Sequence, residues 1–187
     1  RDGKIAVKNA YRKDRPALIA VCDISGSVRA YARFLLLFLY SLGDVLPRVR
    51  SFVFSSRIAE VTALFEDNPA EVAVEMAQRQ YGAGSTDYAA AFRGLLAAAG
   101  RELDRGATVV ILGDGRNNRG DPALEELREI GRRSRRLIWL NPESISAWGT
   151  GDSEMLRYRS CCSDARVVQS IQHLERFADD LLRTAMG

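Results

Sequence analysis

The 187-residue chain has few cysteines and only one histidine. Three cysteines are an odd number, and the adjacent pair Cys161 and Cys162 makes no convenient bridge, so we expect reduced thiols and a cytoplasmic protein. The same pair lacks the further cysteines or histidines that a zinc site needs. The lone histidine, His173, lies far along the chain from the candidate site segments, so we expect a surface or capping role. The sequence therefore excludes a disulfide framework and a serine hydrolase with a histidine base.

Lysine is scarce as well, because only Lys4, Lys8 and Lys13 are lysines and the other 24 of the 27 basic residues are arginines. A P-loop needs a lysine after its second glycine, so the chain is not a nucleotide hydrolase of that type. A net charge of +3 is too small to indicate a nucleic-acid or membrane surface. The arginine-rich segment 132–136 has no interleaved aromatic residues, so we expect no nucleic-acid partner.

Long apolar runs are missing. The longest, residues 34–42, is far shorter than the ~20 residues of a membrane-spanning helix. We therefore expect no membrane span. The chain opens on charged residues without the apolar segment of a secretory signal, so we also expect no cleavable signal. No repeat or flexible linker divides the sequence, and residues 1–187 are predicted to form one domain. A first residue other than methionine leaves open that the chain is a piece of a longer protein.

Strand-like and helix-like segments alternate along the chain. The segments that predict strands are residues 17–22, 49–54, 57–62, 107–112, 137–140 and 165–169. The helical patterns cover residues 28–42, 70–80, 87–99, 122–133 and 173–184. Most of the strands are apolar throughout, as buried parallel strands are, but 57–62 alternates like an exposed edge strand. This order predicts an α/β fold: a doubly wound, mostly parallel six-stranded sheet with helices on both faces.

Oxygen-bearing side chains follow two of these strands and precede one helix. Asp23, Ser25 and Ser27 follow the first strand, Asp114 follows strand 107–112, and Thr86 lies before the third helix. In an extended turn, residues i, i+2 and i+4 project to the same side, so the first three can face one point. Carboxylates and hydroxyls are suitable ligands for Mg²⁺ or Mn²⁺. The five residues predict a divalent-metal site at the carboxyl ends of the strands.

Helix capping is the alternative role for these residue types. Serine and aspartate are preferred N-cap residues, so Asp23, Ser25 and Ser27 taken alone could form a capping cluster. Thr86 and Asp114 favour the metal site instead. For Asp87, next to Thr86, we expect capping of the third helix.

The five residues resemble the metal-ion-dependent adhesion site (MIDAS) of a von Willebrand factor A (VWA) domain. Further segments are similar to CoxE-like proteins: Leu112-Gly-Asp-Gly-Arg-Asn-Asn118, Trp139-Leu-Asn-Pro-Glu143 and Trp148-Gly-Thr-Gly-Asp-Ser-Glu-Met155. The resemblance implies a Rossmann-like VWA fold with one antiparallel edge strand. It also implies an intact MIDAS in which an Asp or Glu of a partner protein completes the shell of Mg²⁺ (or Mn²⁺). The implied partners are a bacterial MoxR-type AAA+ ATPase and a client metalloenzyme, whose maturation the domain would assist as an adaptor.

A Mg²⁺-dependent phosphotransferase with an aspartate nucleophile is the alternative function. Asp23 and Asp114 are suitably placed for it. The residue two positions after the nucleophile is Ser25, however, whose pKa is too high for a general acid. No lysine follows residue 13 to stabilise a developing phosphoryl charge. We therefore expect a binding module and not an enzyme.

Three arginines flank the candidate site in the sequence. Arg29 lies just after Ser27, and Arg116 and Arg119 lie just after Asp114. Arginine forms bidentate hydrogen bonds to carboxylates. We therefore expect these arginines to form a basic rim that steers a partner's carboxylate toward the cation.

Overall fold

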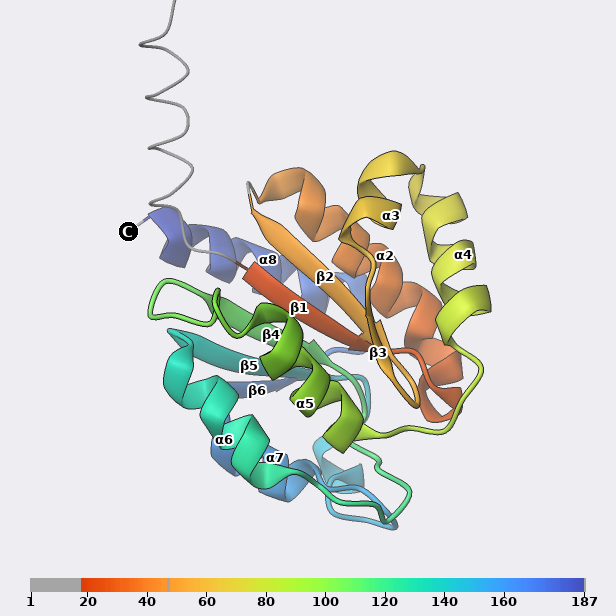
Figure 1. Ribbon diagram of the computed structural model, residues 1–187, viewed down its shortest axis with the longest axis vertical. Helices are drawn as coiled ribbons and strands as arrows, with labels where there is room; N and C mark the ends of the chain where they lie inside the picture. The colour runs from red at the N-terminus through yellow and green to blue at the C-terminus, as the bar shows by residue number, and fades with distance from the viewer. Residues whose placement is uncertain (1–17, 47, 187) are drawn as a thin grey trace, which may run out of the picture.

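The centre of the fold is a six-stranded sheet with the strand order β3-β2-β1-β4-β5-β6 (Figure 1). The computed structural model describes residues 18–46 and 48–186, with side chains to residue 184. The strands are β1 (Leu18–Asp23), β2 (Val49–Phe54), β3 (Ile58–Glu60), β4 (Thr108–Leu112), β5 (Arg136–Asn141) and β6 (Asp164–Val167). Only β3 pairs antiparallel in this sheet; the other pairs are parallel. The predicted doubly wound sheet with one antiparallel edge strand is confirmed.

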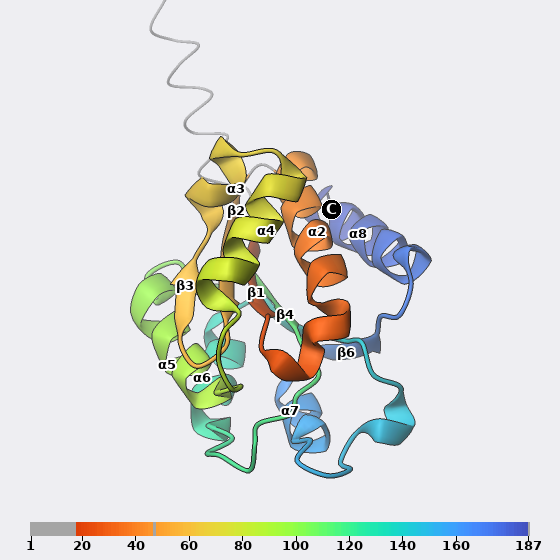
Figure 2. The ribbon, with the colours of Figure 1, turned by 90° about the vertical axis from the view of Figure 1, so that its right-hand side faces the viewer.

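Helices cover both faces of the sheet (Figures 1 and 2). One face carries α2 (Arg29–Val45), α3 (Thr62–Asp67), α4 (Ala70–Tyr81) and α8 (Ile171–Met186). The other face carries α5 (Tyr88–Ala99), α6 (Leu124–Arg133) and α7 (Met155–Cys161). Two short 3₁₀ helices, η1 (Gly26–Val28) and η2 (Ile145–Ala147), lie in loops. Within the described ranges, no helix has both the length and the apolar character needed to cross a membrane.

The core consists of two apolar layers, one on each side of the sheet. In β1, Ala20 and Cys22 face the α2 layer, whereas Ile19 and Val21 face the α5 layer. Every residue of β1 and β4 is buried, which explains the continuous apolar runs at residues 18–22 and 109–112. Because β1 and β4 are packed on both faces, their carboxyl ends provide a rigid base for the loops that follow.

The structure differs from the sequence prediction in two short helices and several boundaries. Helices α3 and α7 were not expected, because six or seven residues are too few for a helical hydrophobic period. Helix α6 begins at residue 124 rather than 122, because Ala123 has a left-handed φ of 49° and donates its N–H to Asp121. The other predicted elements are present with ends shifted by up to three residues.

Candidate metal centre

Three chain segments meet at the carboxyl ends of β1 and β4. The two strands are parallel neighbours with Cys22 opposite Leu112, so Asp23, the last residue of β1, and Asp114, in the loop after β4, lie at the same end of the sheet. The loop before α5 carries Thr86, and its Asp87 N–H donates to the Ser55 carbonyl after β2. The point where strand order reverses is the usual ligand position in such sheets. The structure therefore brings together all the residues that the sequence predicted for the site.

The hydroxyl groups of Ser25, Ser27 and Thr86 form a cluster. The Ser25 Oγ lies 2.5 Å from the Thr86 Oγ1 and 3.2 Å from the Ser27 Oγ. The Ser27 Oγ lies 3.4 Å from the Thr86 Oγ1. Ser25 and Thr86 are buried, whereas Ser27 is exposed. The cluster therefore has a buried floor and one side open to solvent.

The carboxylates of Asp23 and Asp114 differ in the hydrogen bonds that their oxygens accept. Asp23 accepts one hydrogen bond at each oxygen, from the Ser25 N–H at 2.9 Å and from the Tyr88 hydroxyl at 3.1 Å. Asp114 Oδ1 accepts from the Arg116 N–H at 2.9 Å. Asp114 Oδ2 is buried and has no hydrogen-bond partner within the described chain. An unsatisfied buried carboxylate oxygen is costly, and a bound cation would satisfy it.

Burial disfavours the charged form of both carboxylates. Burial first, and then the nearby charge of Asp114, raise the pKa of Asp23 to about 7, against the opposing hydrogen bonds from Ser25 and Tyr88. Burial also raises the pKa of Asp114, against the opposing hydrogen bond from the Arg116 N–H. A cation beside two close, buried carboxylates favours the charged form of both.

The donor set consists of two carboxylates and three hydroxyls. No group of three His, Cys, Asp or Glu side chains that could hold a metal is found in the described part of the chain. Cation binding here would therefore depend on the hydroxyls of Ser25, Ser27 and Thr86 as much as on the carboxylates. Hard divalent cations accept such neutral oxygen ligands, so the residues present fit Mg²⁺ or Mn²⁺.

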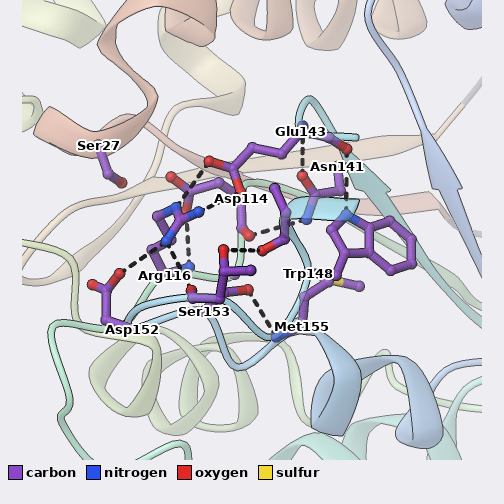
Figure 3. A network of polar contacts seen from close by, with 12 residues as sticks. Ser27, Asp114, Arg116, Asn141, Glu143, Trp148, Asp152, Ser153 and Met155 are labelled. Atoms are coloured by element: carbon purple, nitrogen blue, oxygen red, sulfur yellow. Dashed lines mark hydrogen bonds and ion pairs between the residues drawn. The ribbon is translucent and has the colours of Figure 1, made fainter. Parts of the chain in front are cut away.

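The expected role of Arg116 is wrong. Its guanidinium binds both oxygens of Glu143, at 2.8 and 3.0 Å, and its Nη1 binds an oxygen of Asp152 at 3.1 Å (Figure 3). These ion pairs raise the pKa of Arg116, and its side chain is only 22% exposed. Arg116 is thus occupied within the chain and is not available for a partner's carboxylate. The sequence reasoning missed its partners, although both lie in the segments that resemble CoxE-like proteins.

Arg29 and Arg119 remain exposed near the site. Neither forms an ion pair with the side chains that the structure describes. Arg119 has a left-handed φ of 59°, and its neighbour Asn118 has one of 51°. Asn118 donates through its Nδ2 to the Thr86 carbonyl at 3.3 Å, which holds this loop against the site. Of the three arginines predicted to form a basic rim, Arg29 and Arg119 are thus the two that are exposed and not paired with described side chains.

The other residues considered in the sequence have structural roles. Asp87 caps α5 by accepting from the Ala90 N–H at 2.9 Å. His173 accepts from the Gln169 N–H at 3.2 Å at the start of α8, as a capping histidine does. Cys161, the last residue of α7, and Cys162, which follows it, are free thiols.

Solved structures with similar folds define the class of protein. The von Willebrand factor type A protein from Catenulispora acidiphila has a TM-score of 0.66 at 12% identity, covering 93% of this chain and 43% of that chain. BatB from Bacteroides thetaiotaomicron has a TM-score of 0.65 at 16% identity, covering 92% and 100%. Manganese-loaded TRAP protein from Plasmodium vivax has a TM-score of 0.60 at 18% identity, covering 87% and 71%. The chain has the Rossmann-like fold of VWA domains.

The family follows from the sequence. The model of the family described as "VWA domain containing CoxE-like protein" matches residues 4–177, and the chain therefore belongs to that family. No curated protein matches the chain significantly. The chain spans less than half the length of the Catenulispora protein.

Proposed function

We propose that this chain is a divalent-cation-dependent protein-binding module. Asp23, Ser25, Ser27, Thr86 and Asp114 would hold Mg²⁺ or Mn²⁺. The main support is Asp114 Oδ2, which is buried and has no hydrogen-bond partner among the described residues. It lies at the end of the sheet where a second carboxylate and three clustered hydroxyls are found. The manganese in the P. vivax TRAP structure, which has the same fold, agrees with this cation class.

The charge and exposure of the site favour a partner that supplies an Asp or Glu. Two protein carboxylates balance a divalent charge, and the hydroxyl ligands are neutral, so the cation would still attract an external carboxylate. Ser27 is the exposed member of the hydroxyl cluster, so an approaching side chain can reach this side. Exposed Arg29 and Arg119 add positive charge beside it, which steers acidic groups.

Membership of the CoxE-like family extends the proposal to the partner. We propose a MoxR-type AAA+ ATPase, with the domain acting as an adaptor in the maturation or metal-centre assembly of a client enzyme. The proposed location is the cytoplasm, which suits three free cysteines, one of them, Cys22, buried in β1.

The proposed role is non-catalytic. In the alternative phosphotransferase, Asp23 would attack a phosphoryl group, but its side chain is fully buried and both of its oxygens accept hydrogen bonds. The general-acid position two residues later is Ser25. A phosphatase assay with Mg²⁺ should therefore show no turnover, and turnover that disappears in Asp23→Asn would establish the enzyme instead.

Calorimetric titration with Mn²⁺ and Mg²⁺ tests the cation site. The wild type should bind one cation, and Ser25→Ala, Thr86→Ala and Asp114→Ala should each lose binding because each removes an oxygen of the site. Ser134→Ala, which removes a buried hydroxyl at the end of α6, is the matched control and should bind as the wild type does. Equal binding by all of these proteins would refute the proposed site.

A further inference from the structure

Tyr88 links the two halves of the candidate metal centre. It is the first residue of α5 and is fully buried. Its hydroxyl donates to Asp23 Oδ2 at 3.1 Å and accepts from the Gly115 N–H at 3.1 Å. Asp23 ends β1, whereas Gly115 directly follows Asp114 in the loop after β4. One hydroxyl thus holds a carboxylate of the first segment and the backbone next to the carboxylate of the second.

The packing around Tyr88 fixes the direction of that hydroxyl. Its ring lies in an aromatic cluster, with centroids 4.9 Å from Phe54, 5.4 Å from Trp139 and 5.3 Å from Tyr158. Its backbone N–H donates to the side chain of Asn117 at 2.9 Å. A side chain held at both its backbone and its ring has little rotational freedom, so the hydroxyl stays aimed at Asp23.

Gly113 shows how closely this arrangement is built. A Cβ at residue 113 would lie 2.4 Å from the Tyr88 hydroxyl oxygen and 2.9 Å from the Asp23 Cβ. Any larger residue at this position would displace the tyrosine hydroxyl, the carboxylate or both. The contact between Tyr88 and Asp23 therefore requires the glycine that the chain has after β4.

We propose that Tyr88 is a positioning residue of the metal centre, which fixes Asp23 and the Asp114 loop in the arrangement that binds the cation. This inference rests on the proposed function. The hydroxyl does not itself need to contact the cation. It sets the rotation of the Asp23 carboxylate and stabilises its charged form by donating a hydrogen bond. Loss of such a supporting hydrogen bond typically weakens metal binding about 10- to 100-fold.

Two tyrosines of the same cluster provide a matched pair of variants. Tyr88→Phe and Tyr158→Phe each remove one buried hydroxyl, but the Tyr158 hydroxyl has no hydrogen-bond partner in the described chain. Mn²⁺ affinity should be measured by calorimetry for both variants and the wild type. We expect Tyr88→Phe to bind Mn²⁺ about 10- to 100-fold more weakly and Tyr158→Phe to bind it as the wild type does.

A third variant separates positioning from general destabilisation. Phe92→Leu creates a packing defect beside Tyr88, whose ring centroid lies 5.6 Å away, without removing a polar group. The stability of each variant is measured by chemical unfolding in chelator, next to its Mn²⁺ affinity. Positioning predicts that Tyr88→Phe loses far more affinity than Phe92→Leu does, whichever of the two is less stable.

The outcomes distinguish this inference from the proposed function. If the wild type binds Mn²⁺ and Tyr88→Phe binds it as tightly, or no more weakly than Phe92→Leu, the positioning role is wrong and the metal site stands. If the wild type does not bind Mn²⁺, both are wrong.

Discussion

Asp114 has the least favourable environment of the candidate site residues when no cation is bound. Its Oδ2 is buried without a hydrogen-bond partner among the described residues, and its charge lies close enough to Asp23 to raise the pKa of that carboxyl. Both effects destabilise the folded state of the metal-free protein. A residue that costs stability without its ligand is typical of a functional position.

Replacing Asp114 by asparagine should therefore separate stability from binding. Asp114→Asn keeps an oxygen for the Arg116 N–H and removes the charge, so we expect the metal-free variant to be more stable by about 1 kcal/mol. This corresponds to a rise in Tm of roughly 2–4 °C, measured by thermal unfolding in chelator. The same variant should lose Mn²⁺ binding. A lower Tm in chelator would show that Asp114 stabilises the fold by itself.

Sequence patterns identified the candidate ligands but not the residues that support them. Asp23, Ser25 and Ser27 lie within five residues, so their common direction follows from local geometry alone. Tyr88 begins an apolar helix, and nothing in its sequence neighbourhood separates a core tyrosine from one whose hydroxyl reaches Asp23. That contact joins residues 65 positions apart and depends on the packing of the whole aromatic cluster.

At the scale of secondary-structure elements, Arg116 connects the loop after β4 to the long loop after β5. It binds Glu143 near the start of that second loop and both Asp152 and the Thr150 carbonyl near its end. Residues 116 and 153 also form an isolated antiparallel bridge. The loop after β5 is thereby held against the candidate metal centre, although it contributes none of the predicted ligands.

Loss of this arginine should destabilise the fold more than loss of an exposed one. Arg116→Ala leaves Glu143 and Asp152 without their partner at sites that are 22% and 28% exposed, so we expect a loss of about 2 kcal/mol in the free energy of unfolding. Arg128→Ala is the control, because its partner Glu125 is 78% exposed, and it should cost below about 1 kcal/mol. Urea unfolding of both variants measures the difference. Equal losses would mean that the arginine does not hold the two loops together.

The predictability of the elements depended on their length and position. Buried strands such as β1 and β4 were predictable because both faces are covered and nearly every residue is apolar. Helix α7 was not predictable, because only Met155 and Tyr158 of its seven residues are buried. Two apolar positions are too few to show a helical period. The left-handed residue at Ala123 was equally hidden, since alanine gives no sequence signal for a positive φ.

At the scale of the whole molecule, the fold should not depend on the cation. The two apolar layers pack on the faces of the sheet, whereas the candidate metal centre lies at the carboxyl ends of β1 and β4. Chelator should lower Tm only by the linkage effect of ligand loss. At a cation concentration ten times Kd, this is about 1.4 kcal/mol, or roughly 3–6 °C. Differential scanning calorimetry with Mn²⁺ and with EDTA measures it, and cooperative unfolding in EDTA at room temperature would show that the metal is structural.

Exposed arginines lie at both ends of the strands, so either end could bind a partner. Arg29 and Arg119 are exposed in segments at the end of the sheet that carries the candidate ligands. Arg135 is exposed just before β5 begins, at the opposite end. If a partner's carboxylate completes the cation shell, we expect the first two arginines to steer it more than Arg135 does, because interactions between exposed charges are screened within about 10 Å at 0.1 M salt.

Binding to a MoxR-type ATPase from the same organism tests this surface. Surface plasmon resonance in Mg²⁺ should show that Arg119→Glu weakens the complex about tenfold, mostly through a slower association rate, and more at low salt. Arg135→Glu makes the same charge change at the other edge and should bind as the wild type does. EDTA should weaken the wild-type complex at least as much as Arg119→Glu does, because it removes the cation that the partner's carboxylate would bind. If EDTA has no effect and both arginine variants bind as tightly as the wild type, the partner uses another face. The segment from Trp139 to Met155 then becomes the next region to mutate.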